Sequence, residues 1–241
     1  MWEIRRGDLG RLIGALRARG VTDGLRLARD RWLWRFDRAY DRQEGVATEG
    51  KLRLEEMSNF PANAGGEWYL PARVLVLRRI FDRMGVAARD FVFIDIGAGK
   101  GRAALLAAEH PFRRIIGVEH TPELHACFEA NAVRLTKRRA RIPPIQPVLG
   151  DATEFDLPEE NCVLFFFNPL KPEALTKLVA RIAGSYRAKP RRIVILFLNP
   201  ARRNRVREII AQAGVFRIRT LRDPWFAAIS RFPLLICETD R

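Results

Sequence analysis

The sequence predicts an α/β fold: a doubly wound, mostly parallel sheet of seven strands with helices on both faces and a C-terminal antiparallel hairpin. Five apolar runs alternate with helical patterns, which is typical of parallel strands joined by helices. The apolar runs are 91–96, 114–118, 145–149, 162–167 and 193–198, and the helical patterns cover about 101–110, 122–138, 171–186 and 202–213. Two more segments, 215–221 and 232–238, are predicted strands joined by a loop that contains Asp223-Pro224-Trp225, so they should pair as the hairpin.

Residues 1–66 are expected to form a helical extension that ends in a loop, ahead of a domain at 67–241. Apolar residues at helical spacing support its first helix: Leu9, Leu12, Ile13 and Leu16. Aromatic residues and arginines alternate over 31–36. We expect these aromatics to pack on the main domain, and a helix that lies on a membrane surface or stacks on nucleic acid is the alternative. Pro71 is expected in the first turn of the next helix, whose apolar stripe is Val74, Leu77, Phe81 and Met84.

The composition is that of a globular chain. Of the 241 residues, 48% are hydrophobic and 29% are charged, and the mean hydropathy is −0.15. No run approaches the roughly 18 consecutive apolar residues that a membrane-spanning helix needs, and the first 20 residues lack the apolar stretch of a secretory signal. Cys127, Cys162 and Cys237 are far apart, so we expect buried free thiols, no metal site and a cytoplasmic location.

The net charge of +15 comes from two stretches of the chain. Residues 174–207 hold ten basic residues and no acid, and residues 130–150 hold five basic residues and no acid. Such an excess indicates a polyanionic partner only where it shares a face with the functional site. The clusters at 137–141 and 187–192 precede strands, so they are expected at the opposite edge of the sheet, where they could hold a separate polyanion.

The strongest motif is a glycine loop, Asp95-Ile96-Gly97-Ala98-Gly99-Lys100-Gly101-Arg102, between a strand and a helix. Such a loop lets the backbone approach a ligand at the start of the helix. A dinucleotide fingerprint would place its third glycine at position 102, and Arg102 stands there instead. The spacing favours a loop that wraps a nucleoside with an amino-acid tail over one that cradles a pyrophosphate.

With this loop, residues 69–238 resemble the class I, Rossmann-like S-adenosylmethionine-dependent methyltransferases. The resemblance implies S-adenosyl-L-methionine as cofactor. Its implied contacts are the loop residues Gly97, Ala98, Gly99, Gly101 and Arg102, with Asp95 bracing the loop or the methionine end of the cofactor. Glu119, at the end of the second strand, would hold the ribose, and His120 would line the adenine pocket. Asp151, after the third strand, would accept the adenine amine, while the backbone of Ala152 faces the ring.

Tyr69-Leu70-Pro71, together with Arg102, is similar to a narrower group, the seven-stranded non-SET histone-lysine methyltransferases and their bacterial relatives. There the Tyr-x-Pro segment helps to cover the methionine end of the cofactor, a role that falls to Tyr69. The group usually has Ser or Thr after the proline, whereas this chain has Ala72.

Asn168-Pro169 follows the fourth strand, where amino-methyltransferases of this fold carry Asn/Asp-Pro-Pro-aromatic. The resemblance implies that the Asn168 oxygen and a backbone carbonyl orient an acceptor nitrogen; two acceptors fix the direction of its lone pair. The second proline and the aromatic are missing, and Asn199-Pro200 repeats the dipeptide after the fifth strand. A protein amine is the favoured acceptor and nucleic acid an alternative. The rival functions are an NAD(P)-dependent oxidoreductase and a non-catalytic binding protein of the same fold that acts on nucleic acid.

Overall fold

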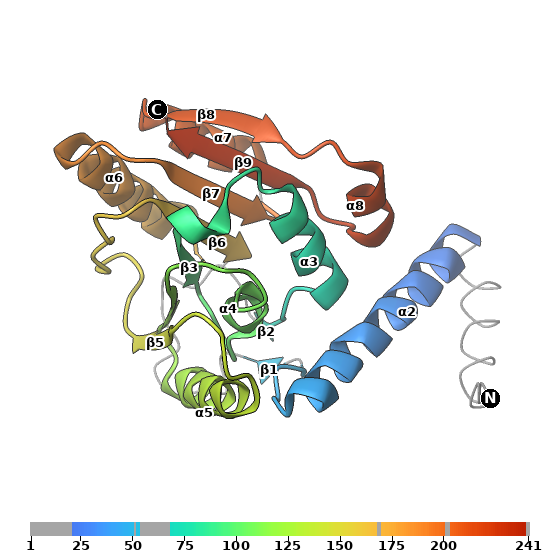
Figure 1. Cartoon of the computed structure of the whole chain (residues 1–241). Coiled ribbons are helices and arrows are strands. Elements are labelled where there is room, and N and C mark those ends of the chain that lie inside the picture. The colour runs from blue at the N-terminus through green and yellow to red at the C-terminus, as the bar shows by residue number, and fades with distance from the viewer. Residues whose placement is uncertain (1–20, 51, 54–67, 168–169, 201–202, 240–241) are drawn as a thin grey trace, which may run out of the picture.

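The computed structural model describes residues 21–50, 52–53, 68–167, 170–200 and 203–239. Its centre is a seven-stranded sheet with the strand order β5-β4-β3-β6-β7-β9-β8 (Figure 1). The strands are β3 (Val92–Ile96), β4 (Ile115–Glu119), β5 (Ile145–Leu149), β6 (Cys162–Phe167), β7 (Ile193–Leu198), β8 (Phe216–Thr220) and β9 (Leu234–Thr239). Neighbouring strands are parallel except around β9, which runs antiparallel to both β7 and β8. The predicted α/β class, parallel sheet and C-terminal hairpin are confirmed.

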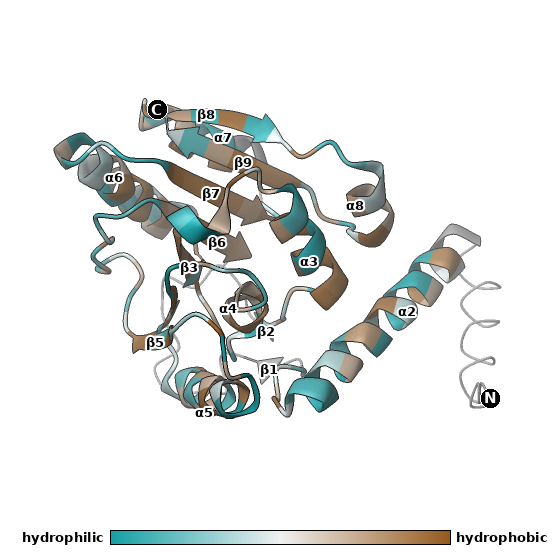
Figure 2. Ribbon diagram, in the orientation of Figure 1, coloured by the Kyte–Doolittle hydropathy of each residue, from teal (hydrophilic) through white to brown (hydrophobic). Residues whose placement is uncertain are grey.

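Alternate side chains of the central strands point to opposite faces and enter two separate cores. In β3, Phe93 packs in the first core and Ile94 in the second. The first core lies under α3 (Val74–Arg83), α4 (Arg102–Ala107), α5 (Pro122–Arg138) and α8 (Pro224–Ile229), and the second lies under α6 (Pro172–Ala188) and α7 (Arg203–Gln212). Figure 2 shows hydrophobic residues along β6, β7 and β9, as expected for strands buried on both faces. A short 3-10 helix, η2 (Ala88–Asp90), precedes β3.

The connection between β8 and β9 is a helix, so the loop expected there was wrong. Asp223 caps α8, since its side chain accepts a hydrogen bond from Phe226 N at 2.7 Å, and Pro224 occupies the first turn. Six residues are too few to show a helical hydrophobic period, which is why only the Asp-Pro start signal was visible in the sequence.

The predicted place of Pro71 in the first turn of a helix was also wrong. α3 begins three residues later, at Val74, and its cap residue Arg73 makes no side-chain capping bond. The cap comes from a distant helix instead, because Asp37 Oδ1 accepts a hydrogen bond from Val74 N at 2.8 Å.

The N-terminal region contributes α2 (Val21–Glu44) and β1 (Leu52–Arg53), which pairs with β2 (Trp68–Tyr69). Leu33 and Tyr40 of α2 are buried in the first core. The aromatics of 31–36 do not pack there: Trp32, Trp34 and Phe36 remain 40, 46 and 36% exposed. The favoured arrangement of these aromatics was therefore wrong. The helix expected around Leu9–Leu16 lies outside the described residues, and the boundary between residues 66 and 67 stays a prediction.

No helix in the described part of the chain is both long and apolar enough to cross a membrane. Cys162 and Cys237 are buried free thiols, as expected. Cys127 is exposed, because it lies on the outer side of α5, so its predicted burial was wrong.

Candidate active site

The glycine loop and three acidic side chains lie at the carboxyl edge of the sheet, where open α/β sheets bind their ligands. β3, β4 and β5 are adjacent and parallel, so the segments that follow them leave the sheet at this same edge. Asp95 is the penultimate residue of β3, Glu119 is the last residue of β4, and Asp151 follows β5 by two residues. The fold therefore brings the three acids predicted from the sequence to neighbouring strand ends.

The glycine loop is fastened to β4 through its backbone. The N–H groups of Gly97 and Ala98 both donate to Val118 O, at 2.9 and 3.0 Å, and Gly101 N donates to Ala98 O at 2.8 Å. These bonds fix the path of the loop before any ligand binds.

The side chain of Glu119 also joins the loop to the end of β4. Its Oε2 accepts a hydrogen bond from Gly99 N at 2.7 Å, and its Oε1 accepts one from Thr121 N at 2.9 Å. The residue is only 7% exposed. Each carboxylate oxygen can accept a second hydrogen bond, so Glu119 keeps one acceptor position on each oxygen for a ligand.

Two aromatic rings lie so close to the loop that they leave no room for side chains there. A Cβ at Gly99 would stand 2.3 Å from Cε2 of Tyr69, and a Cβ at Gly101 would stand 2.0 Å from Cδ2 of Phe128. Both glycines also have positive φ, +58° and +87°, which L-residues adopt reluctantly. Tyr69 thus covers the loop, and its hydroxyl donates to Thr48 O at 2.8 Å. Its place at the methionine end of the cofactor stays a prediction. The contact with Phe128 was not anticipated from the sequence.

Asp95 is buried beneath the loop at the start of α4. It accepts a hydrogen bond from Ala104 N at 3.2 Å and so satisfies one of the free N–H groups of the first helical turn. Burial raises the pKa of Asp95 to about 7, since this hydrogen bond offsets only part of the lost hydration, and the charge of Glu119 raises the pKa further.

The residues predicted to surround the adenine differ in burial and in hydrogen bonding. Asp151 Oδ1 accepts a hydrogen bond from Thr153 N at 2.8 Å, a local turn that leaves Oδ2 for another donor. Ala152 is buried and His120 is half-buried. All three follow β4 or β5 at the carboxyl edge, beside Glu119.

Arg102 turns away from the loop and toward the N-terminal region. Its Nε donates to Thr48 Oγ1 at 2.7 Å, and its Nη1 lies 3.6 Å from Asp37 Oδ2 and 3.4 Å from Ala72 O. With 3% exposure, the side chain is enclosed by these groups. The structure therefore gives Arg102 partners that support the loop, whereas the sequence had placed it among the cofactor contacts.

Sequence reasoning missed a segment that crosses the glycine loop, residues 46–50, which we call the covering segment. Lys100 Nζ donates to Glu49 O at 2.9 Å, and Asn131 of α5 bonds both Ala47 N and Lys100 O, at 2.9 and 3.0 Å. Only Gly45 and Gly50 marked this stretch in the sequence, as breaks between helices. No local signal indicated that it would lie on a loop 50 residues further along the chain.

Asn168 and Pro169 lie outside the described residues, directly after β6. Asn199, at the end of β7, adopts φ of +52°, a left-handed conformation that asparagine tolerates better than most residues. Its N–H donates to Pro233 O at 3.0 Å, which gives this second Asn-Pro dipeptide a structural role at the turn.

The basic clusters lie away from this edge, as predicted. Residues 137–141 precede β5 and residues 187–192 precede β7, so both clusters are at the amino edge of the parallel sheet. Part of their charge is paired: Arg139 contacts Glu44 of α2, and Arg192 lies 3.3 Å from Glu238.

The strand order separates this sheet from a dinucleotide-binding Rossmann fold. That fold has the order 3-2-1-4-5-6, whereas here the last strand is inserted, antiparallel, between the fifth and sixth strands. Precorrin-6y C5,15-methyltransferase from Geobacter metallireducens GS-15 superposes with a TM-score of 0.51 and 16% identity, over 74% of this chain and 93% of its own. This chain has the class I methyltransferase fold.

Other structures resemble this methyltransferase fold at comparable levels. The pyocyanin biosynthetic protein PhzM gives a TM-score of 0.50 at 13% identity, over 69% of this chain and 55% of its own. An RNA methyltransferase from Salinibacter ruber, solved with S-adenosyl-L-homocysteine, gives 0.48 at 20% identity, over 71% and 95%. No protein-family model and no curated protein sequence matches the chain. The resemblance to the lysine-modifying group therefore stays a prediction.

Proposed function

We propose that this protein is an S-adenosyl-L-methionine-dependent methyltransferase that methylates an amine nitrogen, of a protein lysine or of another amine. One observation carries the cofactor assignment. The glycine loop, covered by Tyr69 and bonded to Glu119, stands with Asp95 and Asp151 at three adjacent strand ends of a methyltransferase fold. The three unpaired cysteines support a reducing, cytoplasmic setting.

The charge of the site fits this cofactor. Asp95 is 3% exposed, and in the described part of the chain no basic side chain pairs with it. A buried acid without a counter-charge is stabilised in its ionised form by a cationic ligand. S-adenosyl-L-methionine carries an ammonium and a sulfonium, and when bound it would supply an already activated methyl group.

The protein's own side chains would hold the cofactor and orient the acceptor nitrogen. Glu119 would accept hydrogen bonds from the ribose diol through the remaining acceptor position on each oxygen, and Asp151 Oδ2 would accept the adenine amine. Tyr69 and the covering segment would exclude water from the loop. A protonated lysine must lose its proton, to water, before it can react. Asn168 would then direct the nitrogen lone pair through its side-chain oxygen, together with the adjacent backbone carbonyl at Pro169.

Calorimetry tests the cofactor assignment directly. We expect adenosylhomocysteine to bind and NAD to show no binding at the same concentrations. Tight NAD binding would favour the oxidoreductase, which the strand order argues against.

Transfer is tested separately, with tritiated S-adenosyl-L-methionine in a lysate treated with nuclease or protease. Label that survives nuclease but not protease supports a protein amine. Label lost to nuclease indicates nucleic acid. Adenosylhomocysteine binding without any transfer would favour the binding-protein alternative.

A further inference from the structure

A pocket lies next to the glycine loop along the carboxyl edge of the sheet. The pocket is open to solvent, and its cavity volume is about 60 Å³. Phe167 and Leu198, the last residues of β6 and β7, form its floor. Because β6 is the neighbour of β3, the pocket stands beside the strand that leads into the glycine loop.

One short segment, residues 69–73, borders both the glycine loop and the pocket. Tyr69 covers Gly99 of the loop, and the next residues, Leu70 to Arg73, line the pocket. A ligand in the pocket would therefore approach the loop from the side that Tyr69 faces.

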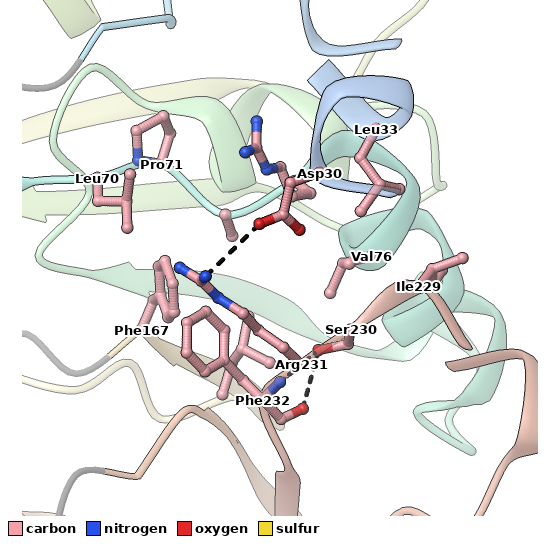
Figure 3. Close-up of a pocket in the computed structure, with 13 residues that line it drawn as sticks. Asp30, Leu33, Leu70, Pro71, Val76, Phe167, Ile229, Ser230, Arg231 and Phe232 are labelled. Carbon is pink, nitrogen blue, oxygen red and sulfur yellow. Dashed lines mark hydrogen bonds and ion pairs between the residues drawn. The ribbon is translucent and has the colours of Figure 1, made fainter. Parts of the chain in front are cut away.

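The walls of the pocket are mostly apolar. Phe167 and Phe232 lie with their rings 5.7 Å apart, and Leu33 of α2, Val76 of α3 and Ile229 of α8 add further apolar side chains to the lining. Figure 3 shows these side chains turned toward one space from separate parts of the fold. An aliphatic stem can be desolvated against such walls.

One cation crosses this apolar space. The Arg231 guanidinium reaches toward Asp30 Oδ2 at 3.5 Å (Figure 3), and its side chain is 56% exposed. Asp30 is shared, because Arg29 Nη2 lies 3.2 Å from its other oxygen. Arg73, also on the rim, has its own close partner, Asp37 at 2.7 Å. Among the residues that line the pocket, two are cationic, Arg73 and Arg231, and one is anionic, Asp30. The contact between Arg231 and Asp30 is long and exposed, so it contributes little to stability.

We propose that the methyl acceptor binds in this pocket and is an amine joined by an apolar stem to a carboxylate. Arg231 pairs with this carboxylate in place of Asp30. This rests on the proposed methyl transfer. A carboxylate can meet the guanidinium in the bidentate geometry that Asp30 does not achieve. A strongly basic peptide would meet like charge at the rim and is excluded.

Two sources present this chemistry, a lysine between acidic residues of a peptide and a free amino acid. Four probes separate them by isosteric pairs: 6-aminohexanoate against 6-aminohexanamide, and the end-blocked peptides Glu-Leu-Lys-Leu-Glu against Gln-Leu-Lys-Leu-Gln. Binding is measured by calorimetry on the full chain with saturating adenosylhomocysteine, so the readout does not require turnover. We expect at least one carboxylate probe to bind about tenfold more tightly than its amide partner, and the discriminating pair identifies the source.

Three variants test the role of Arg231. Arg231→Gln should reduce the discrimination between carboxylate and amide to less than about twofold, while Asp30→Asn should tighten the carboxylate probe about threefold, because it removes the competing acid. Arg138→Gln, an exposed arginine at the amino edge, should change neither value. A merely structural Arg231–Asp30 pair would make both variants weaken binding.

The outcomes distinguish this inference from the function on which it rests. Equal affinities within both pairs, no binding by any probe, or weaker binding by Asp30→Asn would overturn the acceptor assignment while adenosylhomocysteine still binds. Failure of adenosylhomocysteine to bind would instead overturn the proposed function.

Discussion

The backbone N–H of Gly99 donates a hydrogen bond to Glu119 Oε2 over 2.7 Å, and this bond joins the glycine loop to the end of the neighbouring strand. A single carboxylate therefore both shapes the loop and faces the position proposed for the ribose. Binding and loop geometry should depend on it together.

Glu119→Ala removes both functions of this carboxylate. We expect adenosylhomocysteine to bind at least about tenfold more weakly, since a hydrogen bond to a charged group contributes about 1.5–3 kcal/mol. Isothermal calorimetry measures the affinity, with Glu173→Ala, an exposed acid at the start of α6, as the matched control. Unchanged affinity in Glu119→Ala, with the fold intact by circular dichroism, would remove Glu119 from the site.

Gly99→Ala tests the contact between the loop and Tyr69. The new Cβ would stand 2.3 Å from the tyrosine ring at a φ of +58°, so either the ring or the loop must move. We expect a loss of at least about 2 kcal/mol in the free energy of unfolding, from backbone strain and overpacking, together with loss of cofactor binding. Gly184→Ala, in the middle of α6 with open space at its Cβ, should be neutral or slightly stabilising. Equal effects of the two substitutions would contradict the close packing of Tyr69 on the loop.

Asp37 joins the N-terminal helix to the main domain. Its fully buried carboxylate caps α3 through Val74 N, pairs with Arg73 at 2.7 Å and faces the enclosed guanidinium of Arg102. Removing one partner from a buried charge network costs about 3–5 kcal/mol. Asp37→Ala should lower the free energy of unfolding in urea by about that amount, and Asp37→Asn by less, because the amide oxygen can still cap α3.

A surface acid provides the control for Asp37. Asp156, whose side chain is 98% exposed beside Arg181, should change stability by less than about 0.5 kcal/mol when replaced by Ala. Comparable losses at the two positions would mean that α2 does not stabilise the domain.

The sequence was a good guide wherever the signal was local. Apolar runs predicted the five parallel strands of the sheet, and the spacing of Gly97, Gly99 and Gly101 predicted a tight loop. The cap of α3 could not be predicted, since Asp37 and Val74 are brought together only by the packing of two helices. The same holds for Thr48 and the covering segment. The exposure of Trp34 likewise depends on which face of α2 meets the core. Leu33 and Tyr40 are buried in that core, so Trp34 points outward.

Asp95 should make stability depend on pH. Its pKa is about 7 in the folded protein against 3.8 ordinarily, so between these values the folded state binds more protons than the unfolded state. The free energy of unfolding therefore falls as the pH rises from about 4 to about 7, by up to about 4 kcal/mol for a shift of this size. Asp95→Asn keeps an acceptor for Ala104 N and should lose this dependence, so its advantage over the wild type appears above pH 7. Urea unfolding at pH 5 and pH 8 measures the difference; parallel losses in both proteins would contradict it.

Asn168→Ala tests the proposed orientation of the acceptor nitrogen. Loss of one acceptor should reduce turnover by the equivalent of about 1–3 kcal/mol of transition-state stabilisation, with the affinity for adenosylhomocysteine nearly unchanged, because Asn168 would contact the acceptor alone. The second Asn-Pro dipeptide supplies the control. Asn199 has φ of +52°, so Asn199→Gly relieves the backbone and keeps the N–H bond to Pro233 O, whereas Ala there would add strain. We expect Asn199→Gly to retain full turnover in the labelled-cofactor assay. Equal loss in the two variants, or a methyl group located on oxygen or carbon by mass spectrometry, would contradict transfer to a nitrogen held by Asn168.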